Sequence, residues 1–297
     1  TIGDAHKMFI SNYREQIVES LKLNNKFADI RNRMQVDYAN DRQRELGKSV
    51  DSVKLPVLIN TNTNKIDTDF EIGTSNDVHM LVTGGTGSGK SRFLFSIISS
   101  IAMNYHPDDV ELWLIDCKIN EFKPFIDRYR LPHIKLVALE RTEEFCRAFF
   151  KSLSEVVAER VKLFGKMGKK SFDEYRAAMG DPYCMPRIII IVDEFHALIQ
   201  VLNDDRKLKL EMENALAEYR SYGISFIFSD QSYEKITMSL QQVNCRIALR
   251  GDVENMKQTL RLKGDYSQPL ISDFEQSEGK GDAWWGKKVP TRFKNVF

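Results

Sequence analysis

Short apolar runs alternate with longer stretches of mixed polarity through most of the chain. From His79 onward the short runs fit strands, and the longer stretches carry apolar residues at helical intervals. This alternation is typical of a mostly parallel sheet flanked by helices, so we predict an α/β fold. The predicted strands are 80–82, 110–115, 187–192, 224–228 and 245–249, and the predicted helices are 91–103, 142–164, 172–179 and 208–222.

The first fifty residues have a different pattern. The stretch 4–46 contains no proline, is rich in charge and spaces its apolar residues as a helix does, which predicts one or two amphipathic helices. We expect the apolar face to pack on a core; a packing collar, a linker and a subunit contact are all open roles for this segment. That face consists of Phe9, Tyr13, Ile17 and Leu21.

A break at 47–51 separates this segment from the rest of the chain. The apolar run 56–59 then predicts a strand, 60–64 a polar turn, and 66–72 the returning partner of a hairpin. We therefore expect an N-terminal helical segment over 1–50 and an α/β domain over 51–297.

The amino-acid composition indicates an ordinary globular protein but does not indicate its function. A hydrophobic content of 42% and a charged content of 29% are ordinary for a soluble globular protein. The net charge of +1 gives no overall attraction to nucleic acid or anionic membranes, although a local basic stripe is compatible with it. The four cysteines form no CxxC pair, so we expect neither a cysteine-bound metal nor disulfides, and a reducing compartment.

The chain shows no membrane or export signal of its own. No apolar run approaches the roughly 20 residues that cross a bilayer, and no signal-peptide pattern opens the chain. Because it begins with Thr1, we expect a segment of something longer. The expected location is cytoplasmic, with any membrane tether in regions outside this sequence.

The sequence GGTGSGKS, which joins a predicted strand to a predicted helix, has the form of a phosphate-binding loop. Its glycines let backbone N–H groups turn toward phosphate oxygens, and the following helix adds its positive end. Lys90 is expected to reach the β- and γ-phosphates of ATP, and Ser91 to ligate Mg²⁺. The predicted nucleotide-binding residues are Gly84, Gly85, Thr86, Gly87, Ser88, Gly89, Lys90, Ser91 and Arg92.

Two acidic residues end the isoleucine-rich strand. We predict Asp193 as the acid on the metal side and Glu194 as the general base that activates water. The adjacent Asp-Glu pair, with no guanine-reading NKxD sequence, favours an ATPase over a GTPase. The strand 224–228 also ends in polar residues, of which Gln231 fits either a sensor of the γ-phosphate or a plain turn.

Several segments in order resemble the motor domain of the FtsK/SpoIIIE family. The resemblance runs from about Leu55 to the C-terminus and implies a RecA-like fold, a hexameric ring and ATP held between subunits. Members of that family pump double-stranded DNA, and relatives power type VII secretion. The segments are HMLVT with GGTGSGKS, LIDCK, LPH, VDEF, YGISF leading to DQ, CRIALR and GKGD.

The resemblance also implies roles for single residues. It makes Gln231 the γ-phosphate sensor and places Asp116 and Lys118 near the site. Its trans-acting arginine comes from the helix after LPH, where Lys151 aligns and Arg147 lies one turn earlier. Lysine lacks the planar fork that suits phosphate, so the candidates are Arg147, Arg160 and Arg246, with Arg147 preferred.

Some positions depart from the family pattern. Cys117 and the residues at 119–120 match neither the DNA pumps nor the secretion motors, and DQSY replaces the common TQRP. We expect double-stranded DNA as the substrate, with 166–170 as a basic pore-facing loop or a plain solvated loop. A type VII secretion ATPase is the alternative, and a nucleotide switch without turnover is a third reading that Glu194 disfavours.

Overall fold

The computed structural model describes residues 49, 52–74, 76–118, 121–127, 131–181, 184–262, 268–277, 279, 281–286 and 289–295. The predicted helices of 4–46 lie outside these residues, so the division of the chain at residue 50 stays a prediction. Among the described residues, no helix combines the length and apolar character needed to cross a bilayer.

The described residues build a nine-stranded sheet in the order β2-β11-β10-β9-β4-β8-β7-β5-β6. The strands from β9 to β6 are parallel, whereas β10, β11 and β2 extend the sheet with antiparallel pairing. The predicted α/β fold with a mostly parallel sheet is therefore confirmed. The strands are β2 (Leu58–Asn60), β4 (Met80–Thr83), β5 (Val110–Asp116), β6 (Ile134–Ala138), β7 (Arg187–Asp193), β8 (Ile224–Asp230), β9 (Cys245–Leu249), β10 (Asp282–Trp285) and β11 (Thr291–Asn295).

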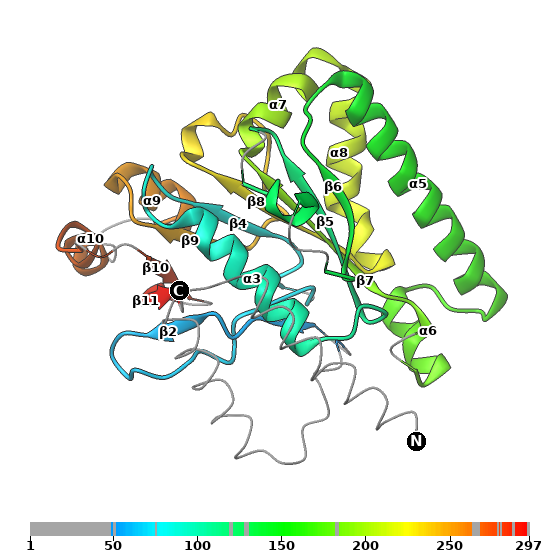
Figure 1. The fold of residues 1–297 in the computed structure, drawn as a ribbon, viewed down its shortest axis with the longest axis horizontal. Coiled ribbons are helices and arrows are strands. Elements are labelled where there is room, and N and C mark those ends of the chain that lie inside the picture. Colours follow the sequence, from blue (N-terminus) through cyan, green and yellow to red (C-terminus); the bar gives the residue numbers. More distant parts are fainter. Residues whose placement is uncertain are drawn as a thin grey trace.

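Helices cover both faces of the sheet (Figure 1). Helix α3 packs on one face, and α5, α7 and α8 pack on the other. Smaller elements surround the sheet, including a separate pair of short strands. The helices are α3 (Lys90–Asn104), α4 (Pro124–Asp127), α5 (Glu143–Lys166), α6 (Phe172–Met179), α7 (Phe195–Asp204), α8 (Arg206–Glu218), α9 (Val253–Leu260) and α10 (Gln268–Glu275), with 3-10 turns η2 (Tyr219–Tyr222) and η3 (Tyr233–Lys235) and strands β1 (Val53–Lys54) and β3 (Glu71–Ile72).

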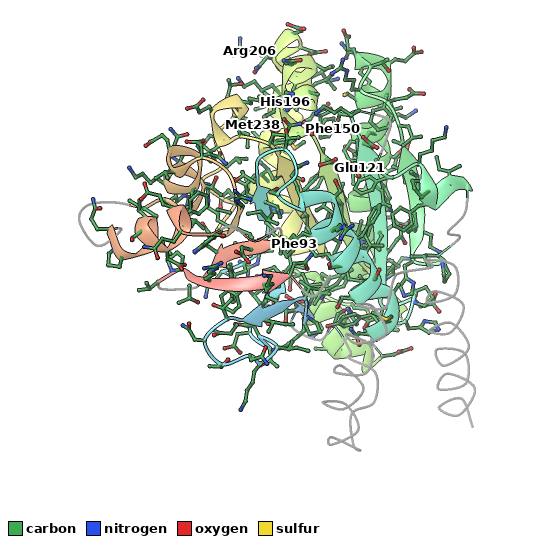
Figure 2. The ribbon with its side chains drawn as sticks, turned by 60° about the vertical axis from the view of Figure 1, so that its left-hand side comes forward. Phe93, Glu121, Phe150, His196, Arg206 and Met238 are labelled. Carbon is green, nitrogen blue, oxygen red and sulfur yellow. The ribbon has the colours of Figure 1, made fainter. Side chains whose placement is uncertain are left out.

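Strand β7 shows why the isoleucine run forms a central strand. Every residue from Arg187 to Asp193 is buried. Ile189 and Ile191 join the core on the α3 side, while Ile188 and Ile190 join the core on the α5 side. Because side chains alternate across a strand, only an apolar run can satisfy both cores. Phe93 and Phe150, labelled in Figure 2, belong to these two cores in turn.

The predicted hairpin over 56–72 is confirmed, with Ile59 opposite Ile66. Strand β2 pairs with β11, and β3 pairs with β1. Beside the Ile59–Ile66 bridge, Asn60 N–H donates to the Lys65 carbonyl at 2.9 Å, and Asp67 N–H donates to the Leu58 carbonyl at 2.7 Å. The polar turn itself forms as expected, because Asn60 Oδ1 accepts the backbone N–H groups of Asn62 and Thr63 at 2.9 and 3.1 Å. Strand β2 therefore contacts the returning segment of the hairpin on one edge and pairs with β11 of the main sheet on the other.

Candidate nucleotide-hydrolysis site

The site lies where the parallel strands β4, β5, β7 and β8 end. The phosphate-binding loop follows β4, Lys118 follows β5, Glu194 follows β7, and Gln231 follows β8. Carboxyl ends of parallel strands share one edge of a sheet, and such edges are the usual ligand sites of open α/β folds. The register pairs Asp116 with Asp193 and Asp193 with Ser229, so the polar ends of three strands stand level.

The phosphate-binding loop is held by the strands behind it. Gly84 N–H donates to the Asp230 carbonyl at 3.2 Å, and Gly85 N–H donates to the Arg250 carbonyl at 3.0 Å. A Cβ on Gly84 would lie 2.6 Å from Ser88 Oγ and 2.8 Å from Leu249 Cβ, so the loop closes only over glycine. Gly89 takes the left-handed conformation, with φ 100°, as the chain enters α3.

The loop fits a polyphosphate. The N-terminus of the fifteen-residue helix α3 carries free N–H groups and a positive partial charge. Ser88 Oγ is buried without a hydrogen-bond partner among the described residues, and a phosphate oxygen would supply one. Ser91 lies half-buried in the first turn of α3, while Thr86 and Arg92 are exposed. The predicted nucleotide-binding residues thus share one cradle, and their individual roles stay predictions.

Lys90 joins this cradle to the acids of β7. Its Nζ lies 2.7 Å from Asp193 Oδ1 and 3.6 Å from Glu194 Oε1, and the side chain is 9% exposed. Burial by itself would lower the Lys90 pKa, but Asp193 and then Glu194 outweigh it and raise the pKa. Lys90 therefore stays protonated at neutral pH. Ser229 Oγ also donates to Asp193 Oδ1, at 2.8 Å.

Glu194 is the most constrained residue of the site. Its backbone is left-handed, with φ 53°, which a residue with a side chain adopts only at a cost of order 1 kcal/mol. Its Oε1 accepts Lys118 Nζ at 2.8 Å and Gln231 Nε2 at 2.9 Å, whereas its buried Oε2 has no hydrogen-bond partner among the described residues. Burial by itself would raise the Glu194 pKa. The opposite effect of Lys118, Gln231 and Lys90 is larger, so the pKa is lowered and the carboxylate is ionised.

The donor set also fits a hard divalent cation. Asp193 and Ser91 offer oxygen atoms, which Mg²⁺ prefers, beside the loop that would hold the phosphates. Asp116 does not share this task, because its carboxylate accepts the backbone N–H groups of Lys118, Glu121 and Phe122 at 2.9, 2.7 and 3.1 Å. It shapes the loop that carries Lys118 instead.

The four cationic candidates for a trans-acting residue differ sharply in exposure. Arg147 and Lys151 are exposed on α5, and Arg147 pairs with Glu143 Oε1 at 2.8 Å and with Asp205. Arg160 and Arg246 are wrong as candidates, because both are buried and bind main-chain carbonyls of their own chain. These acceptors are Tyr222 and Pro186 for Arg160, and Leu240, Val243 and Thr259 for Arg246.

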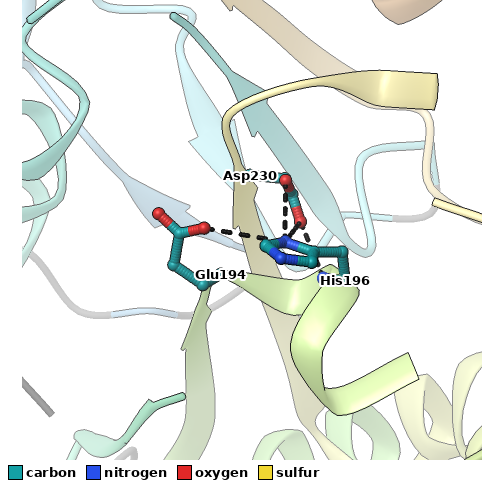
Figure 3. A group of neighbouring side chains, drawn as sticks. All are labelled: Glu194, His196 and Asp230. Atoms are coloured by element: carbon teal, nitrogen blue, oxygen red, sulfur yellow. Dashed lines mark hydrogen bonds and ion pairs between the residues drawn. The ribbon is translucent and has the colours of Figure 1, made fainter. Parts of the chain in front are cut away.

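His196 and Ser229 are two residues of the site whose contacts sequence reasoning missed. His196 stands in the first turn of α7, between Glu194 and Asp230 (Figure 3). Its position directly after Asp-Glu-Phe was a signal, since a residue there must lie beside the strand end that carries the acids. The basic stretch at 166–170 lies outside this site, between α5 and α6.

Comparisons with known proteins agree with this geometry. Residues 40–261 match the model of the FtsK/SpoIIIE family. The DNA translocase FtsK of Streptococcus pyogenes serotype M3 (strain SSI-1) is 32% identical over 165 residues, which are 52% of this chain and 19% of that protein. This chain thus spans less than a quarter of the curated translocase that it matches.

Solved structures share the fold at lower identity. The cytoplasmic domain of the Thermomonospora curvata type VII secretion ATPase EccC aligns with a TM-score of 0.67 and 20% identity, over 86% of this chain and 29% of that one. The pCW3 conjugation coupling protein TcpA aligns with a TM-score of 0.61 and 19% identity, over 84% of this chain and 67% of that one.

Proposed function

The chain belongs to the FtsK/SpoIIIE family of P-loop ATPases, and we propose that it uses ATP hydrolysis to translocate double-stranded DNA. One observation carries the hydrolytic part of the proposal. Glu194 is a buried, ionised carboxylate whose Oε1 is fixed by Lys118 and Gln231, while Oε2 has no hydrogen-bond partner within the described part of the chain. A carboxylate in this state can orient a water molecule and accept its proton.

The residues divide the work of hydrolysis between them. The loop from Gly84 to Ser91 binds the phosphates through backbone N–H groups, and Lys90 neutralises charge on the β- and γ-phosphates. Asp193 and Ser91 would hold Mg²⁺, which when bound draws charge from the phosphate oxygens. Gln231 donates a hydrogen bond to Glu194 from the end of β8. Loss of the γ-phosphate could therefore change the position of Gln231 and of the segment that follows β8.

Duplex DNA is the favoured substrate because the sequence-level relatives are DNA translocases. The identity of 32% covers 165 residues, while the secretion ATPase has 20% identity and so supports the fold alone. Lys166 and Lys170 are exposed beside the α5–α6 turn, where they are free to contact phosphates. We propose that the motor works in the cytoplasm.

The proposal includes a homo-oligomeric ring, with six subunits as the expected size and ATP at each interface. Each active site would then be completed by a neighbouring subunit. Arg147 is the favoured contribution of that neighbour because its side chain is half exposed, at 50%, near the start of α5. An arginine placed this way would stabilise charge on the transferring phosphate.

The test is stimulation of ATP hydrolysis by the substrate at low salt. We expect duplex DNA to raise the steady-state rate in a manner that falls steeply as salt increases. Lys90→Ala is the control for hydrolysis by any contaminating enzyme. Stimulation by a helical export peptide and none by DNA, with assembled rings present, would replace DNA translocation with protein export as the function.

A further inference from the structure

His196 connects the proposed general base to the neighbouring strand. Its Nδ1 lies 3.0 Å from Asp230 Oδ2 and 3.6 Å from Glu194 Oε2, so the imidazole stands between two carboxylates (Figure 3). Both neighbours of Nδ1 are acceptors, so Nδ1 must carry a hydrogen. The imidazole is therefore a donor placed beside the oxygen of Glu194 that has no hydrogen-bond partner among the described residues.

Asp230 holds this imidazole from behind. Its Oδ2 accepts the His196 backbone N–H at 2.7 Å, and its Oδ1 accepts the Gln231 backbone N–H at 2.7 Å. The carbonyl of Asp230 accepts Gly84 N–H at 3.2 Å, which ties the same residue to the phosphate-binding loop. Asp230 is fully buried, so these donors fix its carboxylate and the ring that leans on it.

The rest of the Glu194 carboxylate is held on one side only. Lys118 and Gln231 both bind Oε1, and rotation about the final bond of the side chain would still swing Oε2. Within the described part of the chain, the nearest donor to Oε2 is His196 Nδ1, whose hydrogen is bonded to Asp230 and would have to be shared between the two carboxylates. A shift of a few tenths of an ångström would bring the 3.6 Å separation into hydrogen-bond range.

We propose that His196 is a positioning residue that orients Glu194 to accept a proton from the attacking water, with Asp230 fixing the imidazole. This proposal rests on the role of Glu194 as the general base. The geometry predicts an effect on the chemical step without an effect on nucleotide binding, because in the described structure the hydrogen bonds and ion pairs of the His196 side chain go to Asp230 and Glu194.

The test compares three variants for kcat, for KM of ATP and for melting temperature. His196→Ala removes the donor, and we expect kcat to fall about tenfold while KM stays within about twofold. His196→Asn keeps an N–H donor near the position of Nδ1 and should recover most of the loss. Gln200→Ala, an exposed change one turn along α7, is the matched control and should behave as wild type.

A double-mutant cycle separates this role from a structural one. If His196 acts through Glu194, His196→Ala will not slow the residual rate of Glu194→Gln any further. Three outcomes would overturn the proposal. The first is an unchanged kcat in His196→Ala, and the second is a fall in nucleotide affinity or melting temperature that accounts for the lower kcat. The third is an additive effect in the double variant. If Glu194→Gln itself turns over at the wild-type rate, it is the general-base assignment that fails.

Discussion

Lys118 Nζ lies 2.8 Å from Glu194 Oε1, and this ion pair ties the loop after β5 to the end of β7. The carboxylate is buried, whereas the ammonium is 43% exposed. Lys118 is thus a partly exposed group that stabilises the ionised form of a buried carboxylate in the site. The loop that presents it depends in turn on Asp116, which accepts three of its backbone N–H groups.

Replacing Lys118 should change the pH dependence of hydrolysis. Lys118 lowers the pKa of Glu194, so Lys118→Gln should raise that pKa toward the value that burial alone favours. Glu194 acts as a carboxylate, and activity is lost as pH falls through its pKa. The acidic limb of the kcat profile should therefore move to higher pH, so the loss of activity in Lys118→Gln should grow as pH falls.

The measurement is a series of kcat values from about pH 4 to about pH 8, a range that begins near the ordinary glutamate pKa of about 4.3. Lys123→Gln changes an exposed lysine on the same loop and should leave the profile in place. A shift to lower pH in Lys118→Gln, or none, would contradict the ion pair as the cause.

The closure of the phosphate-binding loop gives a second prediction. Gly84→Ala should weaken ATP binding by more than about tenfold, because its Cβ would meet Ser88 Oγ at 2.6 Å and Leu249 Cβ at 2.8 Å. Binding is measured directly with a fluorescent ATP analogue, at saturating Mg²⁺. Gly165→Ala lies within α5 with open space around it and should leave binding unchanged. Equal affinities of the two variants would show that the loop tolerates a side chain at Gly84.

Much of the scaffold could be predicted from the sequence. The helix 172–179 has the predicted bounds, since Ser171 caps its start and Gly180, with φ 67°, ends it. The buried strands β7 and β8 stood out because a strand covered on both faces must be apolar throughout. In each case, local chemistry alone decides the element.

Elements that depend on distant partners were not predicted. Strand β6 lies at the edge of the sheet, so its side chains are only partly buried and give a weak apolar signal. Strand β10 forms by antiparallel pairing with β9 and β11, so both β10 and β11 depend on partners distant in the sequence. The contact of His196 with Asp230 needs β7 and β8 in register, with Asp193 opposite Ser229, and no spacing along the chain gives that register.

Because two histidines are buried, we predict that the free energy of unfolding falls in mild acid. His79 and His133 are each held neutral by burial, which lowers both pKa values to about 4. In the unfolded chain their pKa is about 6.5. Between these values the unfolded state binds more protons, so the free energy of unfolding falls as pH drops from about 6.5 toward 4.

The check is the melting temperature measured at intervals from pH 7.5 down to pH 4.5, a window of about three units that brackets the expected loss. His79 Nε2 binds the Leu216 carbonyl, and Nδ1 accepts the Phe226 N–H, so protonation must break one hydrogen bond. A His79→Gln variant should show a shallower fall. A melting temperature that is flat across this range would contradict the assignment.

Arg147 gives the prediction that tests the ring. If Arg147 acts on ATP bound by a neighbour, Arg147→Ala should lose activity by a large factor, up to about a thousandfold, while it still binds ATP. Lys90→Ala should fail for the opposite reason, because its own site is damaged. Mixed rings would contain interfaces in which an intact Arg147 faces an intact Lys90.

We therefore expect a mixture of the two inactive variants to hydrolyse ATP faster than either one alone. Mixing Lys90→Ala with Glu194→Gln is the matched control, because both changes damage the same side of the interface and leave no complete site. In its own chain Arg147 pairs with Glu143 and Asp205, so Asp205→Asn should release it and leave the mixed-ring rate equal or higher. A mixture no more active than its components would place the trans-acting residue elsewhere, because Arg147 would then serve only its own subunit.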